Sequence, residues 1–571
     1  MKKMKQMNND EKGFFADFFG TLFGYVKKNW KKILVFSLTF LFTVALIYLD
    51  ANTSENVASY AIGEYEVGQI ADRTIYATKS LQADEYFPIS IEEGEKVIRK
   101  GFPITEEDFL KLRKMSSSPN YIDYRAFADK ILYLMLLASL CILFYSPVLI
   151  NRVVELKEVV LESILFLIVF SFATFGDKSA FFQSIYALPV IIPSALCVGL
   201  VAILFGQISA VFFSIIISMG ILCAANFELV PFLFTLASTL TFTRIVRNIE
   251  HRIDMVFSSI GLAVFNVIYI LTLKVIFNDN FIDAIFILPG IAFNGFLSGI
   301  LVLGLLTPLE AILNTASVFR LMDLSDHQNT PMLRKLFLTA PGTYQHSLMV
   351  GQLAESACNK IGANALLARV ASYYHDIGKI EHPEYFTENN IESENKHTDL
   401  NPSLSVSVIK SHVRLGVEKA RQMYLPKQVT DIIVEHHGNG VITFFYNAAK
   451  EKDPSVSIED YKYDGNPPTT KESAVVMLAD SVEAACKTLD KPTAQRLEKF
   501  IQQIINSKIE SHQLDDCALT FGELTKIKEA FVDILAAYYH GRIKYQNQKD
   551  PDEEKNDLND VESNSMGEKN E

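Results

Sequence analysis

Histidine and aspartate residues of the kind that binds metal ions recur along the second half of this 571-residue chain. The sharpest local pattern is the adjacent pair His375-Asp376, which is followed by Gly378 and Lys379. A neutral imidazole and a carboxylate are ligands for divalent metal ions, and one carboxylate can join two ions. Lys379 adds a cation that can steady a phosphate group, although a solvated lysine at a helix end explains it equally well.

Further candidate ligands lie on both sides of this pair, at His346, His412, His436, His437 and Asp480. Such wide spacing excludes a local zinc-finger loop and favours a helical bundle in which facing helices each supply one or two inward ligands. Taken alone, His346 or His412 is better explained as an ordinary core or surface residue. Adjacent side chains on a helix diverge, so only one of His436 and His437 need reach a metal. The joint order of the histidines and aspartates is what predicts a metal centre.

The elements that position these residues fall into two parts of different composition. Hydrophobic residues make up 49% of the chain and charged residues 21%, which indicates a membrane half joined to a soluble half. We expect a membrane anchor at 33–49 and a seven-helix membrane domain at 131–307, because the apolar runs approach the ~20 residues that cross a bilayer. The seven runs lie at about 131–150, 158–175, 185–205, 208–225, 229–243, 255–276 and 284–307. Together with the anchor they predict about eight crossings, so both ends of the chain lie on one side.

Basic residues gather in the predicted inner loops, at Arg152 and Lys157 and again around Arg247, whereas the predicted outer loops are short and acidic or neutral. This is the positive-inside pattern. It predicts a multi-pass membrane protein with residues 1–32 and the C-terminal part in the cytoplasm. A cleaved signal peptide fits poorly, because the leading region is long and no small-x-small site precedes Asp50.

The soluble parts have distinct compositions. Residues 50–130 are polar and contain short alternating stretches, which predict a small extracytoplasmic domain with β content. Residues 308–338 have apolar and charged positions at helical spacing and predict a connecting helix. Residues 339–545 predict a helical soluble domain, and the acidic tail 546–571 is expected to be disordered. The fold class is therefore all-α overall.

Charge and cysteine content exclude some functions. The net charge of −13 and the lack of a basic stripe interleaved with aromatic residues argue against a nucleic-acid polymer as partner. None of the six cysteines forms a CxxC pair, and none lies in the predicted outer domain, so neither a cysteine zinc site nor a disulfide framework is expected.

Residues 339–545 resemble the HD superfamily of metal-dependent phosphohydrolases and, within it, the seven-transmembrane HD family of cyclic di-AMP phosphodiesterases. The stretches that carry the resemblance are GTYQHSLMV, IGANALLARVASYYHDIGKI, the ENN of FTENN, HHG, KESAVVMLADSVEAA and the QLDDCALT run that ends in YYHGRI. The layout of an anchor, an outer domain and seven further helices also matches. Departures include Asn439 and Gly440 after HHG, where threonines are usual, and a much shortened outer domain.

The resemblance implies a site for two divalent ions, with Mn or Fe expected. His346, His375, Asp376 and Asp480 would hold one ion. Asp376 would bridge to the second ion, which His412 and His436 would complete, with His437 close by. The implied reaction is hydrolysis of cyclic di-AMP to linear 5′-pApA, in which two metals clamp the phosphodiester and activate a water. Asp376 and Lys379 are the expected catalytic residues.

Alternatives stay open at this point. One is an HD hydrolase that acts on another cyclic dinucleotide or on a guanosine polyphosphate. Another is a membrane receptor that binds a nucleotide without cleaving it. The expected partners are cyclic di-AMP and the lipid bilayer, and a homo-oligomer is left open. A shift of the last membrane helix, carried by a continuous helix over 308–338, is expected to tune hydrolysis, and a passive anchor is the alternative.

Overall fold

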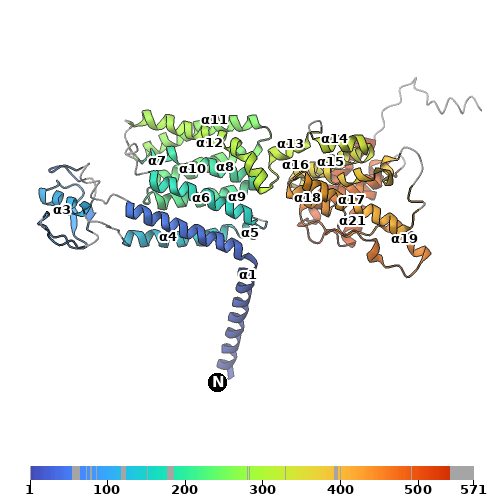
Figure 1. Cartoon of the computed structure of the whole chain (residues 1–571), viewed down its shortest axis with the longest axis horizontal. Coiled ribbons are helices and arrows are strands. Elements are labelled where there is room, and N and C mark those ends of the chain that lie inside the picture. Colours follow the sequence, from blue (N-terminus) through green and yellow to red (C-terminus); the bar gives the residue numbers. More distant parts are fainter. Residues whose placement is uncertain are drawn as a thin grey trace, which may run out of the picture. The chain divides into compact units, whose positions relative to one another are not determined.

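The computed structural model forms two compact units, Met1–Arg320 and Leu321–Glu571 (Figure 1). It describes residues 2–53, 65–71, 74–77, 80–84, 86–117, 124–150, 152–176, 185–279, 281, 283–327, 330–390, 396–398, 400–489 and 492–539. The predicted disordered tail, 546–571, and the predicted outer loop near Asp177 lie outside these ranges.

The first unit consists mainly of long apolar helices. Its main helices are α1 (Lys2–Thr53), α4 (Tyr124–Phe144), α6 (Leu156–Gly176), α8 (Ser194–Phe205), α9 (Gln207–Ala224), α10 (Leu229–Ile245), α11 (Arg252–Ile276) and α12 (Ala284–Leu313), with the short α5 (Pro147–Ile150) and η1 (Val246–Asn248). Among the described residues, seven helices are long and apolar enough to cross a membrane. The predicted polytopic helical membrane domain is therefore confirmed.

The predicted crossing at 185–205 is not one continuous helix. It comprises α7 (Leu188–Ile191) and α8, and Ile192 between them has an extended backbone with ψ 120°. Pro193 favours this break, because a proline disfavours the helical conformation of the residue before it. The predicted anchor at 33–49 is part of the much longer α1, whose apolar span covers Val26–Asp50.

Small residues bring α11 and α12 close together. A Cβ placed on Gly299 would lie 2.4 Å from the Cβ of Ser259, and one on Gly295 would lie 3.0 Å from the Cα of Ala263. These glycines are four residues apart on one face of α12, the spacing that lets membrane helices approach closely. In the last turn of α11, the buried Lys274 ammonium lies 3.1 Å from Asp279 Oδ2 and 2.6 Å from Asp283 Oδ1.

The segment between α1 and α4 contains a small domain with little β structure. Strands β1 (Ile75–Tyr76) and β2 (Lys96–Ile98) pair antiparallel, with Ile75 opposite Ile98, and α3 (Glu106–Ser117) packs beside them. Their shared core includes Ile91, Val97 and Leu112. The predicted β content is present, but in the described residues it amounts to this one two-stranded sheet and a few isolated bridges.

The predicted single connecting helix over 308–338 is wrong. α12 continues through Pro308 to Leu313 and ends at Asn314, which is left-handed with φ 47°. Two separate helices follow, α13 (Val318–Ser325) and α14 (Pro331–Thr339). Asparagine tolerates the left-handed conformation that ends a helix, and Pro331 favours a new helix start. A signal carried by rotation of one continuous helix is therefore excluded.

The second unit is helical in its described residues, apart from one isolated bridge between Val441 and Lys462. Its longer helices are α15 (Pro341–Ile361), α16 (Ala365–Tyr374), α17 (Pro402–Gln422), α18 (Lys427–Glu435), α19 (Thr443–Lys452), α20 (Lys471–Cys486), α21 (Ala494–Glu510) and α22 (Phe521–Tyr539). Short 3-10 turns follow α16, namely η2 (Ile377–Glu381), η3 (Pro383–Tyr385) and η4 (Thr387–Asn389), and η5 (Ile458–Tyr461) precedes α20. Ser473–Asp480 of α20 is buried throughout, so this helix lies in the core of the unit.

Candidate metal centre

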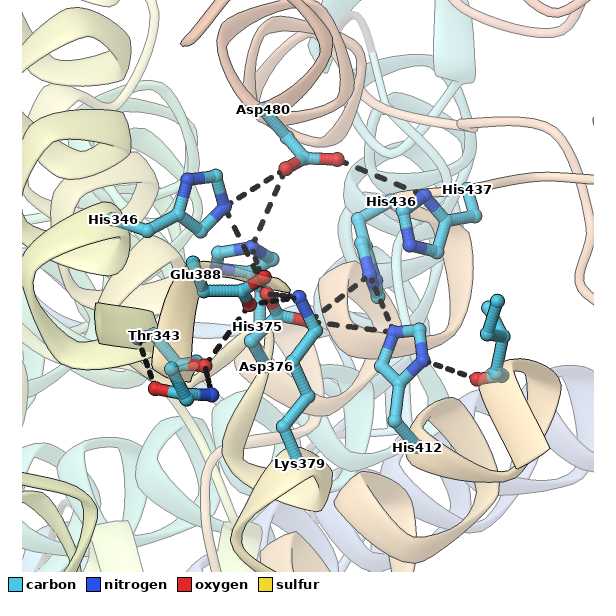
Figure 2. Close-up of polar contacts among 12 residues, drawn as sticks. Thr343, His346, His375, Asp376, Lys379, Glu388, His412, His436, His437 and Asp480 are labelled. Atoms are coloured by element: carbon cyan, nitrogen blue, oxygen red, sulfur yellow. Dashed lines mark hydrogen bonds and ion pairs between the residues drawn. The ribbon is translucent and has the colours of Figure 1, made fainter. Parts of the chain in front are cut away.

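The predicted ligands come together from separate helices at one buried place (Figure 2). His346 lies on α15, His412 on α17 and Asp480 on α20. His375 and Asp376 follow α16, and His436 and His437 follow α18. All seven belong to the predicted set, and His437 is the most exposed, with 22% of its side chain accessible.

Asp376 lies between two groups of histidines, as Figure 2 shows. Its Oδ2 is 3.2 Å from His375 Nε2 and 3.7 Å from His346 Nε2. Its Oδ1 is 3.3 Å from His412 Nε2 and 3.9 Å from His436 Nε2. The two oxygens of one carboxylate therefore face different pairs of imidazoles.

Asp480 makes a second connection between the groups. Its Oδ1 lies 3.0 Å from His346 Nε2 and 3.7 Å from His375 Nε2. Its Oδ2 lies 3.6 Å from His437 Nδ1. Asp480 thus faces three of the histidines.

Carbonyl oxygens of the preceding turn fix the orientation of three imidazoles. The Nδ1–H groups of His375, His412 and His436 donate to the carbonyls of Ser372, Ile409 and Ile433, at 2.6, 2.5 and 2.8 Å. A proton on Nδ1 leaves Nε2 as the lone-pair nitrogen, the state that a metal requires.

His346 is held differently, by a residue that sequence reasoning missed. Its Nδ1–H donates to Glu483 Oε2 at 2.5 Å, and the Glu483 side chain is 4% exposed. Glu483 follows Asp480 by three residues on α20, so the two share a face of the helix. That spacing was a signal in the sequence that could have identified this carboxylate.

Gly378 allows α17 to approach the residues after Asp376. A Cβ at this position would lie 1.8 Å from the carbonyl oxygen of His412 and 2.7 Å from the nitrogen of Gly416. No side chain fits in that space, so glycine at this position permits the close approach of α17.

The Lys379 ammonium contacts carboxylates. It lies 2.7 Å from Asp376 Oδ2, 2.9 Å from Glu388 Oε1 and 4.7 Å from the centre of the Phe386 ring. Thr343 donates its hydroxyl to Glu388 Oε1 at 3.0 Å. Glu388 and Thr343 lie in two stretches that carry the family resemblance, ENN and GTYQHSLMV, but neither was predicted as a site residue. Lys379 is thus engaged by two carboxylates.

Burial and neighbouring charges set the protonation of the ligands. Burial raises the pKa of Asp376, but the positive charges of His375 and Lys379 outweigh it and hold that pKa well below its ordinary value. Burial lowers the pKa of His375, but Asp376 and Asp480 outweigh it and raise that pKa to about 10, so metal binding at Nε2 must displace a proton. Burial lowers the pKa of His436 to about 3 and also lowers the pKa of His412. The carboxylate is therefore ionised and these two imidazoles are neutral near pH 7, as metal ligands must be.

The residues present fit divalent metal ions. The ligand atoms of His346, His375 and Asp376 lie within 4.8 Å of one another, and so do those of His412, His436 and His437. His412 Nε2 and His436 Nε2 are 3.3 Å apart, and with both protons on Nδ1 their lone pairs face each other. Among the described residues, the buried His375 Nε2 and Asp376 Oδ1 lack any hydrogen-bond partner. A cation between these donors would satisfy all of them, and a set of nitrogen and oxygen ligands without thiolate suits several divalent ions, Fe, Mn and Zn among them.

A cleft of about 650 Å³ adjoins this centre at His437. Tyr463 stacks on the His437 ring, with centroids 4.2 Å apart and an interplanar angle of 26°. The other lining residues include three cations of α17, Lys410, Arg414 and Arg421.

Fold and site together define a class, a helical membrane protein that carries an HD-type metal-dependent hydrolase unit. Residues 343–485 match the HD domain model, and residues 128–317 match the model described as 7TM receptor with intracellular HD hydrolase. The cyclic-di-AMP phosphodiesterase PgpH of Listeria monocytogenes is 30% identical over 503 residues, which cover 87% of this chain and 70% of that protein. The protein of the same name from Bacillus subtilis is 31% identical over 479 residues, 82% of this chain and 67% of that one. The chain therefore belongs to the seven-transmembrane HD hydrolase family.

A solved structure of the L. monocytogenes PgpH HD domain in complex with cyclic-di-AMP is 42% identical to this chain, with a TM-score of 0.36. The match covers 38% of this chain and 100% of the chain in that structure. The family assignment rests on the matches along the sequence.

Proposed function

We propose that this chain hydrolyses cyclic di-AMP to linear 5′-pApA at a two-metal centre in its HD unit. The observation that carries the proposal is the position of Asp376, whose two oxygens face separate groups of histidines at 3.2 and 3.3 Å. Two relatives that this chain matches over most of its length are cyclic-di-AMP phosphodiesterases by name, which supports the choice of nucleotide.

In this proposal His346, His375, Asp376 and Asp480 hold one ion, and Asp376, His412 and His436 hold the other, with His437 at its edge. Divalent ions bound there supply Lewis acidity toward the phosphate and a water of lowered pKa. The chain's own contribution is to preset these groups. Carbonyls and Glu483 fix the histidine tautomers, and Lys379 holds Asp376 in its ionised form. We assign Lys379 a positioning role toward Asp376 in place of direct phosphate binding.

The cleft beside His437 supports a substrate larger than one phosphate. In the part of the chain that the structure describes, Arg414 and Arg421 have no ion-pair partner, although Glu418 and Asp464 also line the cleft. The planar guanidinium group can bind a phosphate through two hydrogen bonds at once. A cyclic dinucleotide has two phosphodiesters, so one can lie at the metal centre while the cations of α17 receive the other.

A substrate panel tests this function and its alternatives. Purified full-length protein in nanodiscs would be incubated with Mn²⁺ and cyclic di-AMP, cyclic di-GMP, a guanosine polyphosphate or bis-p-nitrophenyl phosphate, followed by product analysis. We expect 5′-pApA from cyclic di-AMP at the highest kcat/KM. Preferred cleavage of another nucleotide would replace the substrate assignment. Tight binding of cyclic di-AMP without product, in protein shown to hold two metals, would favour a non-catalytic receptor.

We also propose the bacterial inner membrane as the location, with the N-terminus and the HD unit in the cytoplasm. The supporting observation is the concentration of basic residues in the loops that contain Arg152, Lys157 and Arg247. Residues 50–130 then lie on the extracytoplasmic side of the membrane.

A further inference from the structure

The first unit contains a cavity of about 500 Å³ lined by α1, α4, α6 and α9. Its walls are apolar for the most part and include Phe36, Phe40, Leu137 and Phe213. The volume is within the ~300–1,000 Å³ typical of small-molecule sites. Among the described lining residues, Glu162 on α6 is the one that carries a carboxyl group, and it is 3% exposed.

Glu162 differs from Glu158, the other buried carboxyl on α6, which lies one turn away. Both oxygens of Glu158 accept hydrogen bonds from the Arg152 guanidinium, at 2.7 and 2.6 Å, and Ser209 adds a third at 2.8 Å. Within the described part of the chain, Glu162 has only the Tyr145 hydroxyl, which donates to Oε2. Its Oε1 is buried and has no hydrogen-bond partner among the described residues. An unpaired buried oxygen is unfavourable, so a ligand that satisfies it gains binding energy.

The cavity opens through the outer surface of the helices. Leu41 of α1 and Ile142 of α4 line it and are 61% and 70% exposed. On a unit that crosses a membrane, such apolar surface faces lipid chains. Tyr145 and Glu162 lie close to the end of α4 at Phe144 and the start of α6 at Leu156. The polar end of the cavity therefore lies toward a helix end, the level at which the ester groups of membrane lipids are found.

We propose that this cavity binds the acyl chain of a membrane glycerolipid, whose ester carbonyl accepts a hydrogen bond from the Glu162 carboxyl. No lysine, arginine or histidine lines the cavity within the described part of the unit. An ionised carboxylate in such surroundings is costly, so the protonated form is favoured. With Oε2 accepting from Tyr145, the Oε1–H group is left to donate, and an ester carbonyl is its complement.

The test uses full-length protein in nanodiscs that contain phosphatidylglycerol with a photoactivatable diazirine in one acyl chain. We expect saturable crosslinking, mapped by peptide mass spectrometry to α1 and α4 residues of the cavity. Glu162→Leu should reduce the apparent affinity about five- to tenfold, the effect of one buried hydrogen bond. Glu162→Gln should retain it within about twofold, because an amide N–H also donates to a carbonyl.

A matched pair of variants tests the volume of the cavity. Ala138→Phe places a ring in the cavity and should abolish saturable crosslinking, whereas Leu136→Phe, at an exposed site outside it on the same helix, should leave it unchanged. Size-exclusion profiles and melting temperatures establish that each variant is folded. Uniform crosslinking over all exposed helices, or wild-type labelling of folded Ala138→Phe, would overturn the proposal. Loss of binding in folded Glu162→Gln would overturn the donor role of the carboxyl, since it would require an ionised group and a cationic ligand.

Discussion

His436 and His437 are consecutive residues with ring centroids 4.0 Å apart, yet they face different carboxylates. His436 Nε2 is 3.9 Å from Asp376 Oδ1, and His437 Nδ1 is 3.6 Å from Asp480 Oδ2. Adjacent side chains within a helix point in different directions. His436 and His437 both follow Glu435, where α18 ends, so their rings can lie close together. The turn after α18 thus directs two adjacent imidazoles to the two acidic residues of the site.

The central position of Asp376 predicts a severe effect of its removal. Asp376→Ala should lower hydrolysis of cyclic di-AMP by more than about a hundredfold, because loss of an outer partner of a ligand alone costs ~10–100-fold. Bound metal, measured by elemental analysis, should fall below two ions per chain. Asp431→Ala, at an exposed site on α18, is the control and should behave as wild type. Near-normal turnover by folded Asp376→Ala protein would refute the two-metal interpretation.

Glu483 is predicted to act through His346. Glu483→Ala removes the acceptor of the His346 Nδ1–H group and should weaken Mn²⁺ binding by roughly 10–100-fold. Glu483→Gln keeps an acceptor oxygen and should recover much of that loss. A Mn²⁺ titration followed by activity and by isothermal calorimetry separates metal affinity from kcat. If kcat at saturating Mn²⁺ falls while metal affinity is unchanged, the positioning role is wrong.

Metal removal should affect stability as well as activity. Treatment with a chelator should abolish hydrolysis, and Mn²⁺ or Fe²⁺ should restore it. A ligand present at 100 times its dissociation constant stabilises the folded state by ~2.7 kcal/mol. The melting temperature of the HD unit should therefore fall on chelation and recover with metal, as measured by calorimetry. Activity that persists in protein free of metal by elemental analysis would contradict the proposed centre.

The cationic side of the cleft predicts a selective loss. Arg414→Ala should raise KM for cyclic di-AMP by roughly 10- to 150-fold, since a hydrogen bond to a charged group contributes ~1.5–3 kcal/mol. The KM for bis-p-nitrophenyl phosphate, which reaches only the metal centre, should not change. Arg334→Ala, at an exposed arginine of α14 that does not line the cleft, serves as the control. Equal losses for both substrates would show that Arg414 supports the metal centre instead.

The proposed topology can be tested by labelling. In protein without its six native cysteines, Ser90→Cys should react with a membrane-impermeant maleimide in intact cells, and Ser403→Cys only after permeabilisation. Both positions are exposed in their own units, so access to the reagent depends on the side of the membrane. The reverse pattern would place the HD unit outside.

Most of the site could be predicted because its ligands have types and an order that few other functions require. The supporting residues could not, since Glu388 lies in a 3-10 turn without periodicity and Thr343 has no distinctive type. Glu483 was within reach through its spacing from Asp480. For the fold, apolar runs indicated the membrane helices but not their breaks. Pro308 lies inside α12, whereas Pro193 separates α7 from α8. Only tertiary contacts decide between those outcomes, because neighbouring helices can satisfy the backbone groups that a proline frees.

The buried Lys274 near the end of α11 has a consequence for biogenesis. In the proposed topology this end of the α11–α12 hairpin must be translocated, and an isolated lysine there would oppose that step. Asp279 and Asp283 lie 3.1 and 2.6 Å from the ammonium, so the hairpin can enter the bilayer with its positive charge already compensated.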